Sequence, residues 1–136
     1  MLIQNYGLHW DWQHGMRGQQ SKGDLLVDFS GIQVGIYVLY AGTKPIYVGR
    51  SGDGKAPSIS GRLVDHERNK TGWNNFCWFG FYPVVDGILQ PRKEPSTTVT
   101  EAISDIEAFA IYLLKGVAKN VASGKHKHII EYHQVV

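Results

Sequence analysis

The chain of 136 residues lacks the features typical of secreted, disulfide-stabilised or membrane-spanning proteins. Its single cysteine, Cys77, cannot form an intrachain disulfide. No apolar run approaches the roughly 18 residues of a membrane span. The first 15 residues have neither the basic start nor the continuous apolar stretch of a secretory signal. We therefore expect one cytoplasmic domain with an ordinary apolar core and no membrane contact.

Strong charge and clustered metal ligands are also lacking. The net charge is only +2, although the segment 44–70 carries six basic against three acidic residues and the segment 115–136 four against one. A solvated surface would explain either basic segment alone, whereas two on one domain favour contact with nucleic-acid phosphates. The C-terminal histidines have no neighbouring cysteine or carboxylate ligands, and we interpret them as part of a basic tail. The predicted nucleic-acid contacts are Lys44, Arg50, Lys55, Arg68, Lys70 and Lys119.

Residues 35–49, GIYVLYAGTKPIYVG, predict an antiparallel hairpin, because two alternating apolar runs flank a turn. In this register Leu39 lies opposite Tyr47 and Tyr37 opposite Gly49. The two tyrosines then share one face as diagonal neighbours, roughly 7 to 8 Å apart. We expect Gly49 to leave a space across from Tyr37 that admits a phosphate. The structural alternative is that tyrosines favour strands and glycines mark bulges.

A helix is predicted over residues 59–69, capped by Ser58 or Ser60. Arg62 and His66 are four residues apart, on the same inward stripe as apolar residues. A buried guanidinium needs an anionic partner, either a carboxylate or a bound phosphate. The alternative is an exposed Arg/His pair on a surface helix.

A second helix is predicted from a capping box, Thr98 to Glu101, through to Leu114. Stepping about 100° per residue, we expect a wide apolar arc that includes Ile103 and Ile106, with Glu107 inside it. A carboxylate there requires a cation, either Arg62 or a divalent metal ion. The alternatives are a buried Glu–Arg pair or a glutamate that reaches water at the edge of the arc.

The predicted fold class is α/β, an α+β sandwich with a central three-stranded antiparallel sheet flanked by helices. Its third strand is the aromatic run 75–85. We divide the chain into an N-terminal extension packed on the domain, 1–31, the domain itself, 32–122, and a basic C-terminal segment, 123–136.

In order along the chain, five landmarks resemble those of the GIY-YIG nuclease superfamily. They are GIY at 35–37, YVG at 47–49, Arg62 with His66, Glu107 in a helix, and Asn120. The resemblance covers roughly residues 32–121. It implies a small nuclease domain with helices around a three-stranded sheet, which hydrolyses phosphodiester bonds.

The resemblance also implies roles for these residues. Tyr37 would activate or position the attacking water, and Tyr47 would orient the scissile phosphate. Arg62 would stabilise the charged transition state, and His66 would support a tyrosine hydroxyl or the nucleophile. Glu107 would hold a single Mg²⁺ or Mn²⁺ ion.

Asn120 would order the neighbourhood of the metal. The implied partner is nucleic acid, DNA more than RNA. Since the sequence indicates no separate recognition domain, we expect site choice to come from loops, from a homodimer partner, or to be absent. A second hypothesis is a non-catalytic nucleic-acid-binding module on the same fold. A third is an interaction protein that docks through the segment with Trp10 and Trp12.

Overall fold

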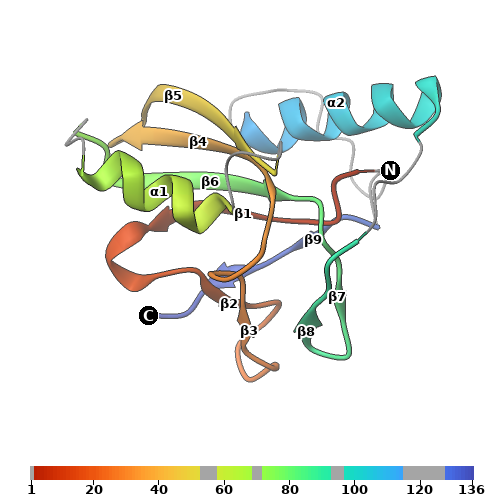
Figure 1. Ribbon diagram of the computed structural model, residues 1–136, viewed down its shortest axis with the longest axis horizontal. Coiled ribbons are helices and arrows are strands. Elements are labelled where there is room, and N and C mark those ends of the chain that lie inside the picture. The colour runs from red at the N-terminus through yellow and green to blue at the C-terminus, as the bar shows by residue number, and fades with distance from the viewer. Residues whose placement is uncertain (1, 53–57, 69–71, 93–96, 115–127) are drawn as a thin grey trace.

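A five-stranded sheet forms the centre of the computed structural model, which describes residues 2–52, 58–68, 72–92, 97–114 and 128–136 (Figure 1). Two helices accompany it, α1 (Ile59–Arg68) and α2 (Val99–Leu113). Across the sheet the strands are, in order, β5 (Lys44–Ser51), β4 (Gly35–Ala41), β6 (Asn75–Gly80), β1 (Asn5–Asp11) and β9 (Ile130–Glu131). The neighbouring strands pair antiparallel except β1 and β9, which are parallel.

The mixed α/β class agrees with the prediction, but the prediction of three strands is wrong. The two additional strands come from segments that we had placed outside the domain. β1 pairs with β6 and β9 pairs with β1, so residues 5–11 and 130–131 belong to the central sheet. The alternation in these short segments is too weak in the sequence to indicate pairing with strands so distant along the chain.

Small elements pack on the same face of the sheet as α1, since Val27 and Leu89 lie in one core cluster with Ile59 and Leu63. A three-stranded sheet consists of β10 (His133–Gln134), β2 (Arg17–Gln19) and β3 (Val27–Asp28). A short hairpin joins β7 (Val84–Val85) to β8 (Ile88–Leu89), and η1 (Trp12–His14) is a single 3₁₀ turn. The strand predicted over 75–85 is shorter in the structure. β6 ends at Gly80, and β7 pairs with β8 in a separate two-stranded sheet.

Two apolar clusters fill the two faces of the central sheet. On one face, Tyr37 and Leu39 of β4 pack with Ile59 and Leu63 of α1. On the other, Val38 packs with residues of α2. Because side chains alternate along a strand, the two helices cover opposite faces. Trp10 is only 2% exposed within the first cluster, whereas Trp12 is half-buried, so only Trp12 of the two is available for the docking surface of our third hypothesis.

The α2 helix begins as predicted, since Thr98 and Glu101 form the capping box. The predicted apolar arc, however, is wrong. Asp105 is buried and accepts hydrogen bonds from the backbone N–H groups of Leu2 and Ile3, at 2.9 and 3.2 Å. Ile103 and Ile106 lie exposed instead, at 61% and 69%. The N-terminal backbone supplies the donors that make a buried carboxylate tolerable.

Neither helix of the described residues is long and apolar enough to cross a bilayer.

Candidate functional site

The β4–β5 hairpin brings the two predicted tyrosines to one face. Tyr37 lies opposite Gly49 and Leu39 opposite Tyr47, and a bulge then places Tyr40 opposite Pro45 rather than Ile46. The rings of Tyr37 and Tyr47 stack with centroids 6.2 Å apart and an interplanar angle of 25°.

The space across from Tyr37 is filled, not empty as we expected. A Cβ atom built on Gly49 would overlap the ring and hydroxyl of Tyr37. The phenol therefore leans across the glycine, and Tyr37 is fully buried. Gly49 is required for the position of the Tyr37 ring rather than for the approach of a phosphate.

The α1 helix lies over this hairpin and supplies a histidine. Ser58 caps the helix, since its hydroxyl accepts a hydrogen bond from the Gly61 N–H at 3.0 Å. Ile59 and Leu63 are fully buried, so the stripe that also carries His66 faces the sheet, as predicted. The Tyr37 hydroxyl lies 2.8 Å from His66 Nε2. The imidazole also lies over Tyr47, with ring centroids 4.5 Å apart.

Arg62 completes the group of side chains between α1 and the hairpin. Hydrogen bonding to the Tyr37 hydroxyl, and to a smaller extent the proximity of Tyr47, raises the pKa of the guanidinium. Its Nε atom is buried and has no hydrogen-bond partner in the part of the chain that the structure describes. An unsatisfied buried donor is costly. The guanidinium as a whole is half-buried, so its accessible N–H groups are the ones that can donate to an anionic oxygen of a ligand.

The surroundings shift the pKa values of Tyr37 and His66 in opposite directions. Burial raises the pKa of the Tyr37 hydroxyl, against the opposing effect of Arg62. Burial lowers the pKa of His66, the Arg62 charge lowers it further, and the carboxylate of Asp65 acts in the opposite direction. At neutral pH the pair is therefore a neutral phenol and a neutral imidazole. Asp65 is a neighbour that the sequence analysis missed, because nothing in its spacing distinguishes it from a solvated helix residue.

Exposure decides which of these groups a ligand can touch. Tyr47 is 42% exposed and His66 and Arg62 are half-buried, whereas Tyr37 is fully covered. We name Tyr37, Tyr47, Arg62 and His66 the tyrosine cluster. Its accessible groups are a phenol, an imidazole and a guanidinium, which together can bind an anion and accept a proton.

The structure does not bring Glu107 to the tyrosine cluster. Glu107 is half-buried on α2, which packs on the opposite face of the sheet. It lies about 100° around the helix axis from Ala108, the fully buried residue that faces the sheet. The described residues beside the tyrosines hold no set of ligands that fits a divalent ion, and no such group of histidine, cysteine, aspartate and glutamate side chains occurs elsewhere in the described chain. Asn120 lies outside the described residues.

Of the six predicted nucleic-acid contacts, three lie in the part of the chain that the structure describes. Lys44, Arg50 and Arg68 are exposed. Cross-strand pairing puts Lys44 opposite Ala41, on the face of Tyr37, and Arg50 opposite Ile36, on the other face. The remaining three, Lys55, Lys70 and Lys119, lie outside the described residues.

Comparisons with known proteins add no assignment. No protein-family model matches the chain. No curated protein and no solved structure matches it either.

Proposed function

We propose that this chain is a nuclease of the GIY-YIG type, which hydrolyses phosphodiester bonds in nucleic acid, DNA more than RNA. The observation that supports this most is the 2.8 Å contact between the Tyr37 hydroxyl and His66 Nε2, with Arg62 beside it and Tyr47 on the same face. Phosphodiester hydrolysis needs a proton acceptor for water and donors for the nonbridging oxygens, and this cluster holds both.

His66 is the group best placed to act as the base. Tyr37 is fully buried and its pKa is raised, so it neither reaches a water molecule nor ionises at neutral pH. In the tautomer with its proton on Nε2, His66 donates to the Tyr37 oxygen and presents the Nδ1 lone pair. Nδ1 takes a proton from water, and the resulting hydroxide attacks phosphorus. Tyr37 is then a positioning residue that holds the imidazole ring.

The other two residues stabilise the charge that develops on the phosphate. The accessible part of the half-buried Arg62 guanidinium donates to one nonbridging oxygen. The exposed Tyr47 hydroxyl donates to another. The leaving oxygen takes its proton from solvent.

A requirement for Mg²⁺ or Mn²⁺ stays a prediction from the resemblance, and no step above uses the metal ion. Activity should be measured on duplex, single-stranded and branched DNA and on RNA, with either ion or with chelator. We expect the cleavage rate to fall at least about 100-fold in both His66→Gln and Arg62→Ala. Unchanged cleavage by both variants, after confirmation of their folding by circular dichroism, would contradict the proposed site.

A second candidate function is nucleic-acid binding without catalysis. The position of Glu107 favours it, because the carboxylate that the resemblance assigns to the metal lies on a helix of the opposite face. This function predicts DNA affinity that falls steeply between 50 and 200 mM salt, without turnover under any of these metal conditions. Fluorescence anisotropy on the same substrates measures that affinity and separates the two functions.

A further inference from the structure

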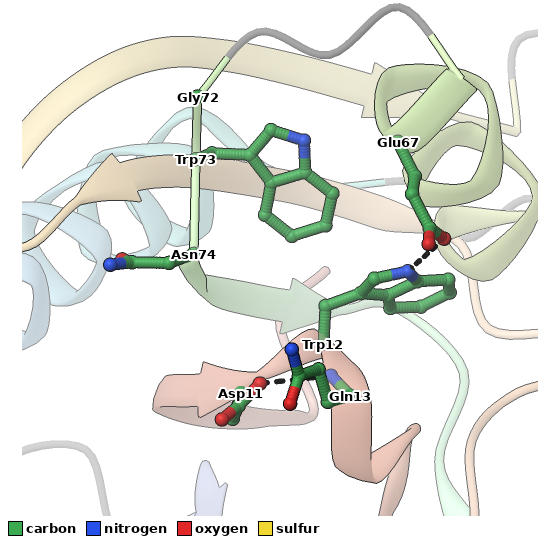
Figure 2. A pocket seen from close by; sticks show the side chains of 7 residues that line it. All are labelled: Asp11, Trp12, Gln13, Glu67, Gly72, Trp73 and Asn74. Atoms are coloured by element: carbon green, nitrogen blue, oxygen red, sulfur yellow. Dashed lines mark hydrogen bonds between the residues drawn. The ribbon is translucent and has the colours of Figure 1, made fainter.

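A pocket outside the tyrosine cluster lies beside the last turn of α1, at the end of the sheet where β1 finishes and β6 begins (Figure 2). It has a volume of about 260 Å³. Its lining comes from the end of β1 and η1, from the last turn of α1, and from the residues before β6. The lining residues are Asp11, Trp12, Gln13, Glu67, Gly72, Trp73 and Asn74.

Two indoles form a corner in this pocket. The rings of Trp12 and Trp73 have centroids 6.0 Å apart and planes inclined at 48°. Each also packs against the fully buried Phe76, at 6.3 and 6.2 Å, so both are held on the core. A nucleobase stacked between them would need parallel rings about 7 Å apart, two contacts of roughly 3.5 Å. A compact group against the corner fits this geometry better than an inserted ring.

The charged residues of the lining determine whether the pocket favours a cation or an anion. Asp11 and Glu67 contribute carboxylates, and none of the seven lining residues is basic. Each carboxylate has one oxygen in a local contact: Glu67 Oε2 accepts from the Trp12 indole, and Asp11 Oδ1 accepts from the Gln13 N–H at 2.9 Å (Figure 2). His14 Nε2 lies 3.8 Å from the second oxygen of Asp11. A phosphate would be repelled here, whereas a cation is attracted by both the carboxylates and the indole faces.

We propose that this pocket binds a guanidinium group. A guanidinium is planar, stacks on an indole face and presents N–H donors at its edge to carboxylate oxygens. A quaternary ammonium group would use the indoles but leave the carboxylates without a donor. The guanidinium could belong to free arginine or to an arginine side chain of a protein. The proposal does not depend on nuclease activity.

The test is a titration of the full chain with L-arginine amide, followed by the four tryptophan indole N–H signals in ¹H–¹⁵N NMR spectra. Trp10 and Trp78 are buried in the core, so we expect saturable shifts for Trp12 and Trp73 alone. The dissociation constant should be on the order of 1 mM, since the contacts are few and partly exposed. L-citrulline amide, which replaces the guanidinium by a neutral urea, is the matched control ligand and should give no saturable shift.

Variants identify the contacts. We expect Glu67→Gln to weaken binding about three- to tenfold, because it removes the charge and keeps an oxygen for Trp12. Trp73→Leu should abolish saturable binding. Asp65→Asn removes an acid of the same helix that does not line the pocket and should bind as the parent does. If circular dichroism shows that Trp73→Leu does not fold, the affinities of Glu67→Gln and Asp11→Asn for arginine amide test the proposal instead.

Equal binding of citrulline amide, or unchanged affinity in Glu67→Gln and Asp11→Asn, would overturn the proposal. So would shifts caused only by tetramethylammonium or by mononucleotides. A capped Gly-Arg-Gly peptide separates the two sources. If it binds at least as tightly as arginine amide, the pocket is open to a protein side chain, and if only arginine amide binds, the ligand is the free molecule.

Discussion

The Tyr37 ring lies across the Cα atom of Gly49, and this contact sets where the Tyr37 hydroxyl meets His66. A side chain at residue 49 would occupy the same volume as the phenol. Gly49 therefore acts on the tyrosine cluster through packing. The two glycines of the repeated pattern, GIY and YVG, both permit close packing, since a Cβ on Gly49 would overlap Tyr37 and a Cβ on Gly35 would overlap the backbone of Phe79.

We expect Gly49→Ala to displace the Tyr37 ring and to lower the free energy of unfolding by about 1–3 kcal/mol, since the core is overpacked. The contact of Tyr37 with His66 should be lost, which a changed His66 titration in NMR spectra would report. Gly31→Ala is the matched control, because a Cβ there meets nothing within 4 Å. A Gly49→Ala protein with parental stability and parental His66 titration would show that the Tyr37 position does not depend on this glycine.

The sequence was sufficient for this part of the site because the residues involved are close along the chain. Strand alternation fixes the faces of Tyr37 and Tyr47, and the four-residue spacing of Arg62 and His66 fixes one side of a helix. The space at Gly49 was misjudged because alternation gives the face of a side chain but not the direction in which its ring leans. Rotamer choice depends on α1, which covers the tyrosine.

The α2 prediction was wrong for a different reason. An arc drawn from residue types assumes that apolar residues face the sheet and acids face water. Asp105 faces inward because the backbone N–H groups of Leu2 and Ile3, more than 100 residues away, satisfy its carboxylate. Partners this distant in sequence have no local signal. Gln33 is a second example. It is buried, and its side-chain amide forms hydrogen bonds with the Asn5 side chain and the Tyr82 backbone.

Arg62→Ala should reduce DNA cleavage about 100- to 1000-fold, as expected when a donor to a developing anion is removed. The rate is measured as single-turnover cleavage of a labelled duplex. Arg17→Ala, which removes an exposed arginine on β2, should leave the rate within twofold of the parent. Equal losses in both variants would indicate a general effect of charge on DNA binding rather than a role for Arg62 in the tyrosine cluster.

The lowered pKa of His66 predicts the direction of the pH dependence. The neutral imidazole is the active form, so the cleavage rate should rise as pH increases through a value below about 6.5 and then level off. The unfolded chain binds this proton more tightly than the folded one. The associated stability is therefore present above the unfolded pKa and is lost as pH falls through the folded pKa. His66→Gln should abolish the acidic limb of the rate profile, and a limb that persists in this variant belongs to another group.

The Glu107→Gln variant tests whether Glu107 holds a metal ion, as the GIY-YIG resemblance implies, or has no part in cleavage, as its position in the structure indicates. Because α2 packs on the sheet face opposite the tyrosine cluster, we expect this variant to cleave within about twofold of the parent rate. The measurement is cleavage across a range of Mg²⁺ and Mn²⁺ concentrations. A large loss of cleavage that higher metal concentration restores would instead assign the ion to Glu107, as the resemblance implies.

Asp105→Ala should destabilise the fold more than any other change in α2 that removes a carboxylate. It leaves two backbone N–H groups, of Leu2 and Ile3, without their acceptor in a largely buried position, at a cost of about 1–3 kcal/mol. Urea unfolding followed by circular dichroism gives the change in free energy. Glu107→Ala, two residues along the same helix, is the matched control, since it removes an acid from a half-buried position with the same replacement. If the two variants unfold at the same urea concentration, the contact between Asp105 and the N-terminal backbone contributes no more than the half-buried carboxylate of Glu107 does, and β1 is held to the domain by its pairing with β6 and β9 and by its core side chains.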